Sequence, residues 1–138
     1  MHETQNTKVV QDAYAAFGRC DGQGILDMLD DGIVWTGVYG AGPHVATSGD
    51  RRGKAQVSEF FKQVAQTVNF SRFEPKEFIA TGDKVVVLVH YRATTMMGKT
   101  FDSDFAMVFR VRDGRVIEFQ EFTDSAAVNA AYQVGASV

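Results

Sequence analysis

The first half of the chain carries three stripes of apolar residues at helical spacing. The first stripe runs from about Thr7 to Arg19 and consists of Val9, Val10, Ala13, Tyr14 and Phe17. Asp21 then predicts the N-cap of a shorter helix, whose apolar stripe is Ile25, Leu26 and Leu29. The clearest stripe is the third, which consists of Val57, Phe60, Phe61, Val64 and Val68. The pattern therefore predicts three N-terminal helices.

Between the second and third predicted helices the pattern changes. Ile33–Thr36 is a short apolar run that predicts a strand. Residues 37–53 contain several glycines and Pro43, and their apolar positions show no steady period. Loops of this length in a compact domain are often functional. We therefore expect residues 37–53 to form a loop that caps the ligand site.

Beyond residue 69 the pattern is typical of strands. The predicted strands are Phe70–Ala80, Lys84–Thr95, Thr100–Val111 and Arg115–Thr123. Pro75 lies inside the first of them and predicts an edge or bulged strand. Asp113-Gly114 is a strong hairpin signal. A last helix is expected from Ser125, with Asp124 as its cap.

These elements predict an α+β fold in which residues 1–138 form a single domain. Consecutive strands that are joined by short turns pair antiparallel. Helices that precede such a sheet must cover one of its faces, because each element has one apolar side to bury. We expect a curved antiparallel sheet wrapped around the three N-terminal helices, with a cone shape and an internal pocket.

Strand alternation separates the residues that face this pocket from those that face outward. On the strand after Met97, the predicted inward set is Phe101, Ser103, Phe105, Met107 and Phe109. On the neighbouring strands, His90 and Glu121 are polar members of apolar segments. Burial among phenylalanine rings raises the pKa of a carboxyl group, as a general acid or base requires, and a histidine beside it can relay the proton.

We therefore predict Glu121 as the general acid or base, His90 as its partner and Tyr14 as a hydroxyl donor in the cavity. A competing interpretation is that His90 and Glu121 only satisfy each other in the core, and that Tyr14 is an ordinary core tyrosine. The predicted ligand contacts are Trp35, Thr36, Phe61, Arg92, Ser103, Phe105, Met107, Phe119 and Thr123. Trp35 and Thr36 alternate, so only one of them can face inward.

Composition and charge exclude several classes of partner. The net charge is −3, with both signs interspersed, so the chain has no basic face for nucleic acid. The N-terminus lacks signal-peptide features and no apolar stretch approaches membrane-spanning length, so we expect a cytoplasmic protein that does not bind membranes. The histidines show no metal-ligand spacing and Cys20 is the only cysteine, so we expect neither a metal nor a cofactor.

The outward face of the predicted sheet indicates self-association. Val87, Val89 and Val108 are expected on this face, where they would leave an apolar patch exposed in a monomer. The pattern therefore predicts a homodimer.

Short motifs along the chain form a set that is specific when taken together. They are Ala13-Tyr14-Ala15-Ala16-Phe17, Asp21, Leu29-Asp30-Asp31 before Trp35, Gly53-Lys54-Ala55-Gln56-Val57, Gly82-Asp83-Lys84-Val85-Val86, Arg112-Asp113-Gly114-Arg115-Val116 and Phe119-Gln120-Glu121-Phe122-Thr123-Asp124. With them, the whole chain resembles the SnoaL-like branch of the ketosteroid-isomerase and nuclear-transport-factor-like superfamily. This fold hosts isomerases, cyclases, dehydratases, epoxide hydrolases and non-enzymatic binders.

The resemblance carries over to single residues only in part. Tyr14 matches the oxyanion-hole tyrosine of the isomerase, whose general base and second acidic residue would fall near Thr36 and Met107, where this chain has no acid. In limonene-epoxide-hydrolase-like members the two catalytic carboxylates would fall at His90 and Glu121, but the arginine of that set is missing. SnoaL-type cyclases use an acidic residue to abstract a proton next to a carbonyl, and Glu121 best matches that role.

Three functional hypotheses stay open at this point. The first is a cofactor-free isomerase, cyclase or hydrolase that acts on a small hydrophobic substrate. The second is a non-catalytic protein that binds a small hydrophobic molecule in the same cavity. The third is a structural module whose cavity is filled by its own Phe and Met side chains.

Overall fold

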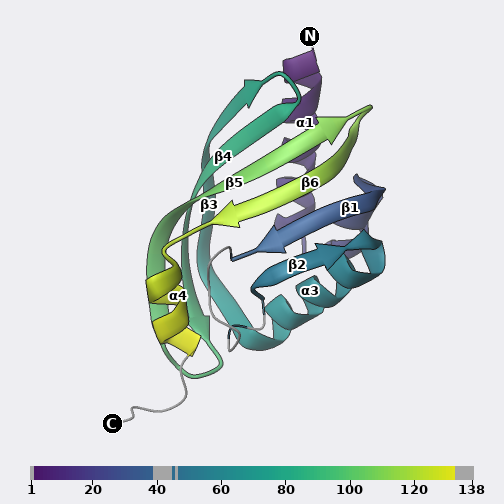
Figure 1. Cartoon of the computed structure of the whole chain (residues 1–138). Helices are drawn as coiled ribbons and strands as arrows, with labels where there is room; N and C mark the ends of the chain where they lie inside the picture. Colours follow the sequence, from purple (N-terminus) through teal and green to yellow (C-terminus); the bar gives the residue numbers. More distant parts are fainter. Residues whose placement is uncertain (1, 39–44, 46, 133–138) are drawn as a thin grey trace.

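The computed structural model describes residues 2–38, 45 and 47–132. Its helices are α1 (His2–Gly18), α2 (Gly22–Asp27), α3 (Gly53–Thr67) and α4 (Ser125–Tyr132). Its strands are β1 (Leu29–Gly37), β2 (Gly49–Arg52), β3 (Val68–Thr81), β4 (Lys84–Thr95), β5 (Thr100–Arg112) and β6 (Arg115–Phe122). The six strands form one curved sheet, with α1 behind it and α3 beneath β1 and β2 (Figure 1).

The sheet is mixed, with the strand order β2-β1-β6-β5-β4-β3. The strands β3 to β6 form the predicted antiparallel meander. The strand β1 pairs parallel with β6 and places Trp35 opposite Phe119. A parallel pair needs a long crossover connection. Here the connection between the two strands contains β2, α3 and the strands β3 to β5. The two partners are therefore far apart in the sequence, and the order of the predicted strands did not indicate that they pair.

One strand lies inside the segment that was expected to be a loop. The strand β2 has the sequence Gly-Asp-Arg-Arg and pairs antiparallel with β1. The prediction of a loop over 37–53 is therefore wrong for this part, because a wholly polar strand carries no apolar alternation to reveal it. Residues 39–44 and 46 of the expected cap lie outside the described residues.

Local signals at the ends of elements are confirmed. The Asp21 side chain accepts a hydrogen bond from the Gly24 backbone N–H at 2.9 Å, and Asp124 accepts one from Ala127 at 3.1 Å. The strand β3 lies at the edge of the sheet, and its register shifts just after Pro75. Proline has no N–H to donate to a ladder, so it is tolerated at such an edge.

The core lies between the concave face of the sheet and the helices. On β5 the predicted inward residues are confirmed, since Phe101, Phe105, Met107 and Phe109 are buried and Ser103 is half-buried. Their neighbours across the ladder are the buried members of β4, which are Val85, Val87, Val89, Tyr91 and Ala93. None of the described helices has both the length and the apolar character needed to span a bilayer.

Candidate functional site

A cavity of about 90 Å³ lies between the helices and the sheet. Its walls come from the helices α1 to α4, from β1 and from the inward face of the meander, and they are almost wholly apolar. The aromatic lining residues are Tyr14, Phe17, Trp35, Phe60, Phe61, Phe70, Phe73, Tyr91, Phe101, Phe109, Phe119 and Tyr132. An engineered apolar cavity of roughly 150 Å³ admits benzene. The present cavity is smaller, so even a ligand with a single ring requires side chains to move.

Glu121 carries the only carboxyl group among the described residues that line this cavity. It lies on the inward face of β6, opposite Met107, and is 6% exposed. Burial raises the pKa of Glu121 to about 7, although the backbone N–H of Val38 donates a hydrogen bond that stabilises the charged form. Near neutral pH the side chain therefore divides between acid and carboxylate, which suits a proton-transfer group.

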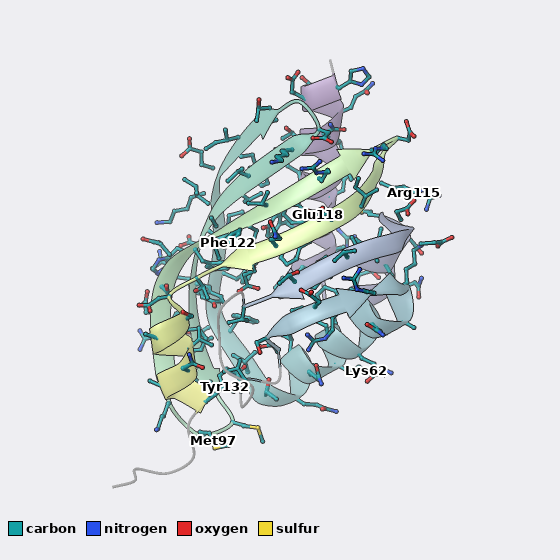
Figure 2. All side chains as sticks on the ribbon, in the orientation of Figure 1. Lys62, Met97, Arg115, Glu118, Phe122 and Tyr132 are labelled. Carbon is teal, nitrogen blue, oxygen red and sulfur yellow. The ribbon has the colours of Figure 1, made fainter. Side chains whose placement is uncertain are left out.

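Three tyrosine side chains line the same cavity. The Tyr14 hydroxyl, on α1, donates a hydrogen bond to the Met107 Sδ atom at 2.7 Å. Figure 2 shows Tyr132 on α4. Its hydroxyl lies 3.2 Å from the Thr67 hydroxyl. Burial and the negative charge of Glu121 raise the pKa of both Tyr14 and Tyr91. The Tyr14 and Tyr91 hydroxyls therefore stay protonated and can act as hydrogen-bond donors.

Trp35 forms a rigid part of the wall. Its ring stacks on Phe119, with centroids 3.9 Å apart and planes inclined by 23°, and meets Phe61 edge-on at 5.4 Å. The indole is 6% exposed. Within the described part of the chain, its buried Nε1 atom has no hydrogen-bond partner. Among the residues that the structure describes, the indole of Trp35 is therefore a buried N–H donor of this site without an acceptor.

Six of the residues predicted as site residues line the cavity. Two of them are the predicted catalytic residues Glu121, on the sheet, and Tyr14, on a helix. The other four are the predicted ligand contacts Trp35, Phe61, Met107 and Phe119. The six residues come from α1, β1, α3, β5 and β6.

His90 does not meet Glu121, and the predicted pair is not formed. The histidine lies on the outer face of β4, where its Nε2 atom is 2.7 Å from Asp102 and its Nδ1 atom is 2.7 Å from Asp104. Residues that pair across an antiparallel ladder project to the same face. His90 pairs with the exposed Asp104, whereas Tyr91 pairs with Ser103 on the inward side.

Tyr91 is the cavity residue that the sequence reasoning missed on this strand. The hairpin between β4 and β5 aligns Ala93 with Phe101 and Val89 with Phe105. Because Phe101 and Phe105 were already expected to face inward, this register would have placed Tyr91 inside and His90 outside. The unbroken valine run of β4 hid the alternation, since both of its faces are apolar.

Three other predicted contacts do not line the cavity. Arg92 is exposed on the same outer face as His90. Thr36 alternates with Trp35, is buried on the other side of β1 and donates a hydrogen bond to Asp50 at 2.7 Å. Thr123 follows the end of β6 and is half-buried.

Two predicted contacts on β5 face inward without lining the cavity. The Ser103 hydroxyl donates a hydrogen bond to the backbone carbonyl of Asp104 at 3.0 Å. The Phe105 ring packs on Tyr91, with centroids 4.0 Å apart, but does not itself line the cavity. Facing inward is therefore necessary for a lining residue but not sufficient.

The sequence and the fold were compared with known proteins. A family model described as the SnoaL-like domain matches residues 10–119. No curated protein sequence matches the chain. An NTF2-like protein from Burkholderia xenovorans LB400 superimposes with a TM-score of 0.85 and 29% identity, over 95% of this chain and 98% of that one.

Two further solved structures are also similar. TerC, co-crystallised with polyporic acid, superimposes with a TM-score of 0.83 and 29% identity, over 93% of this chain and 98% of its own. A putative polyketide cyclase from Xanthomonas campestris pv. campestris matches over 96% and 100%, with a TM-score of 0.76. At 17% identity it supports a common fold alone. From the family model and this shared cone-shaped architecture, we conclude that the chain belongs to the SnoaL-like domain family.

Proposed function

We propose that the cavity binds a small apolar molecule and that Glu121 is the general acid or base that acts on it. The observation that carries this proposal is a buried carboxyl group, with a pKa of about 7, in a cavity that is otherwise almost wholly apolar. Such a group exchanges protons near neutral pH without a cofactor. The reaction classes that suit it are isomerisation, cyclisation and hydrolysis of a small hydrophobic substrate.

The chemistry follows from the two charge states of Glu121. As a carboxylate it takes a proton from a carbon beside a carbonyl group, and as the neutral acid it returns one. The Tyr14 hydroxyl lines the same cavity and keeps its proton, because burial and Glu121 raise its pKa. It would stabilise the developing oxyanion once it turns from the Met107 sulfur to the ligand.

A similar protein supports the binding of a small organic molecule. TerC was co-crystallised with polyporic acid, and its fold superimposes on nearly the whole of this chain. The aromatic walls around Glu121 exclude water, and a charged group that loses its water is destabilised. The cavity therefore disfavours the carboxylate form of Glu121 and, for the same reason, favours a neutral apolar ligand.

Deuterium exchange into a probe ketone tests the acid–base role. Acetophenone in D₂O should exchange its methyl protons faster with the wild-type protein than with buffer, as followed by proton NMR. Glu121→Gln should abolish the excess rate while acetophenone still binds, because the amide keeps the shape of the side chain and cannot accept the proton. His90→Gln is the matched control on the outer face and should keep the rate. Equal rates for wild type and Glu121→Gln would contradict the catalytic role.

A second candidate function is binding without catalysis. It is favoured by the Tyr14 hydroxyl, which is already engaged by Met107, and by the position of His90 on the other side of the sheet. Under this alternative, acetophenone binds the wild type and is recovered after long incubation without excess deuterium.

A further inference from the structure

We propose that Trp35 selects and positions the ligand, because its indole N–H donates a hydrogen bond to an acceptor oxygen on the bound molecule. The ligand is then a neutral, largely apolar compound with a carbonyl-type oxygen. This inference rests on the proposed function that the cavity binds a ligand, and it adds the polar contact that fixes the orientation of that ligand.

The first support is the unsatisfied donor itself. Within the described residues, the buried Trp35 Nε1 atom has no acceptor. Buried polar groups in folded proteins are nearly always hydrogen-bonded, so each exception calls for an explanation. The neighbouring polar groups of the cavity have their own partners, since Tyr14 bonds Met107 and the Glu121 carboxylate accepts from Val38. Trp35 is therefore the donor that this wall keeps available.

The second support is the rigidity of the indole. It stacks on Phe119 at 3.9 Å, and Phe60 and Phe61 pack against it with centroids at 5.8 and 5.4 Å. A side chain held on three sides cannot turn its N–H towards a distant acceptor. Preorganised donors of this kind bind an acceptor without losing further side-chain entropy.

The third support is the position of Trp35 relative to Glu121. Trp35 is the register partner of Phe119, and Glu121 follows two residues later on the same inward face of β6. Both side chains line the cavity. A ligand oxygen held by the indole would therefore bring the neighbouring atoms of the ligand towards the carboxyl group.

Charge decides the class of ligand. The described residues that line the cavity include no Lys, Arg or His, and the ionised form of Glu121 would repel an anion. A carboxylate or phosphate ligand would thus be buried without a counter-ion, at high cost. A neutral carbonyl compound meets the indole N–H and the aromatic walls without such a cost.

The first experiment uses the wild-type protein, because Trp35 is the only tryptophan of the chain. The ¹H–¹⁵N spectrum therefore contains a single indole signal. Titration with acetophenone should move the indole proton downfield, as a new hydrogen bond does. Ethylbenzene replaces the carbonyl by a methylene group of similar shape, and it should bind without that downfield shift.

The second experiment compares affinities for the same two probes. Trp35→Phe keeps an aromatic ring but removes the N–H. It should lower the affinity for acetophenone relative to ethylbenzene by about tenfold, which is the order expected for one buried hydrogen bond. Phe61→Leu is the matched control, because it alters the same wall without changing a polar atom. It should change both affinities in proportion.

The outcomes separate the two proposals. If both probes bind, but the indole signal responds equally to each and Trp35→Phe leaves their affinity ratio unchanged, the role of Trp35 is wrong and ligand binding stands. An indole donor satisfied by a trapped water molecule would give that result. If neither probe binds the wild type, the proposed function is contradicted and the role of Trp35 falls with it.

Discussion

The backbone N–H of Val38 donates a hydrogen bond to the buried carboxylate of Glu121. Val38 adopts a φ of 42°, which is rare for a β-branched residue and costs on the order of 1–3 kcal/mol. A strained backbone position therefore lies beside Glu121, which among the described residues is the only carboxyl group that lines the cavity. The hydrogen bond limits the rise in the pKa of Glu121, because it stabilises the charged form.

Glu121 should make the folded protein less stable as the pH rises. Its pKa is about 7 in the folded state against an ordinary value of 4.5, so between these values the folded protein binds a proton that the unfolded chain has lost. The free energy of unfolding therefore falls across this window, and the loss is complete above it. Relative to Glu121→Gln, the wild type should lose on the order of 3 kcal/mol of its free energy of unfolding across this pH window.

Urea denaturation of both proteins at several pH values measures this difference. The Glu121→Gln variant is the reference for the wild type, because the two proteins share every other titrating group. Parallel stability curves for the two proteins from pH 4 to pH 8 would contradict the raised pKa.

Tyr14 and Met107 should be coupled in stability. Met107→Leu keeps a similar volume but removes the sulfur acceptor, which leaves the buried Tyr14 hydroxyl unsatisfied and should lower the free energy of unfolding by about 1–2 kcal/mol. In the Tyr14→Phe background the same change should cost clearly less. A double-mutant cycle by urea denaturation gives the coupling energy, and additive effects would show that the hydrogen bond contributes nothing.

Gly37 should not tolerate a side chain. A Cβ atom at this position would lie 2.5 Å from the Phe60 ring and 2.5 Å from the Thr47 carbonyl oxygen. Gly37→Ala should therefore destabilise the protein by roughly 1–3 kcal/mol, the range for an overpacked core. Gly18→Ala is the control, since a Cβ there meets no atom within 4 Å. Thermal unfolding of both variants tests the contrast, and similar melting temperatures would contradict it.

His90 should not be needed for ligand binding in the cavity. Its ring is held by Asp102 and Asp104 on the outer face of the sheet, both at 2.7 Å. Both aspartates are well exposed, so the cluster should contribute no more than about 1 kcal/mol to stability. His90→Gln should leave acetophenone affinity unchanged by calorimetry. A loss of binding comparable to that of a cavity variant would show that the two faces are linked.

The outer face of the sheet should form a homodimer interface, although of the residues first expected there only Val108 lies on that face. Val87 and Val89 are buried inside, at 0% and 2% exposure. The apolar row on this face is formed by Leu88, Ala106 and Phe122, which are register partners on three adjacent strands. Leu88 and Phe122 are exposed, and Ala106 is half-buried.

Sedimentation of the wild type at micromolar concentration should therefore give a dimer. Leu88→Glu should shift it towards the monomer, because a charge would be buried in the interface. The control is Lys62→Glu on α3, where the side chain is largely exposed. A monomeric wild type would contradict the prediction.

Most elements of this fold could be predicted because their signals are local. The helical stripe from Val57 to Val64, the caps at Asp21 and Asp124 and the Asp113-Gly114 turn all depend on residues close in sequence. The polar strand β2 could not, because only its partner β1 makes it a strand. For the site, Glu121 and Tyr14 could be predicted because they are polar groups within apolar patterns. His90 shows the same pattern but lies on the outer face of the sheet, so this signal alone does not identify a cavity residue.

The sequence by itself determined the order of the elements other than β2, the inward face of β5 and the presence of a carboxyl group in an apolar segment. These features depend on alternation and on turn residues, which are properties of short segments. Only the tertiary structure decided that β1 lies parallel to β6, that Tyr91 rather than His90 faces the cavity, and that the Trp35 N–H has no partner among the described residues. Each of these depends on the register between segments far apart in the chain, and no local pattern records that register.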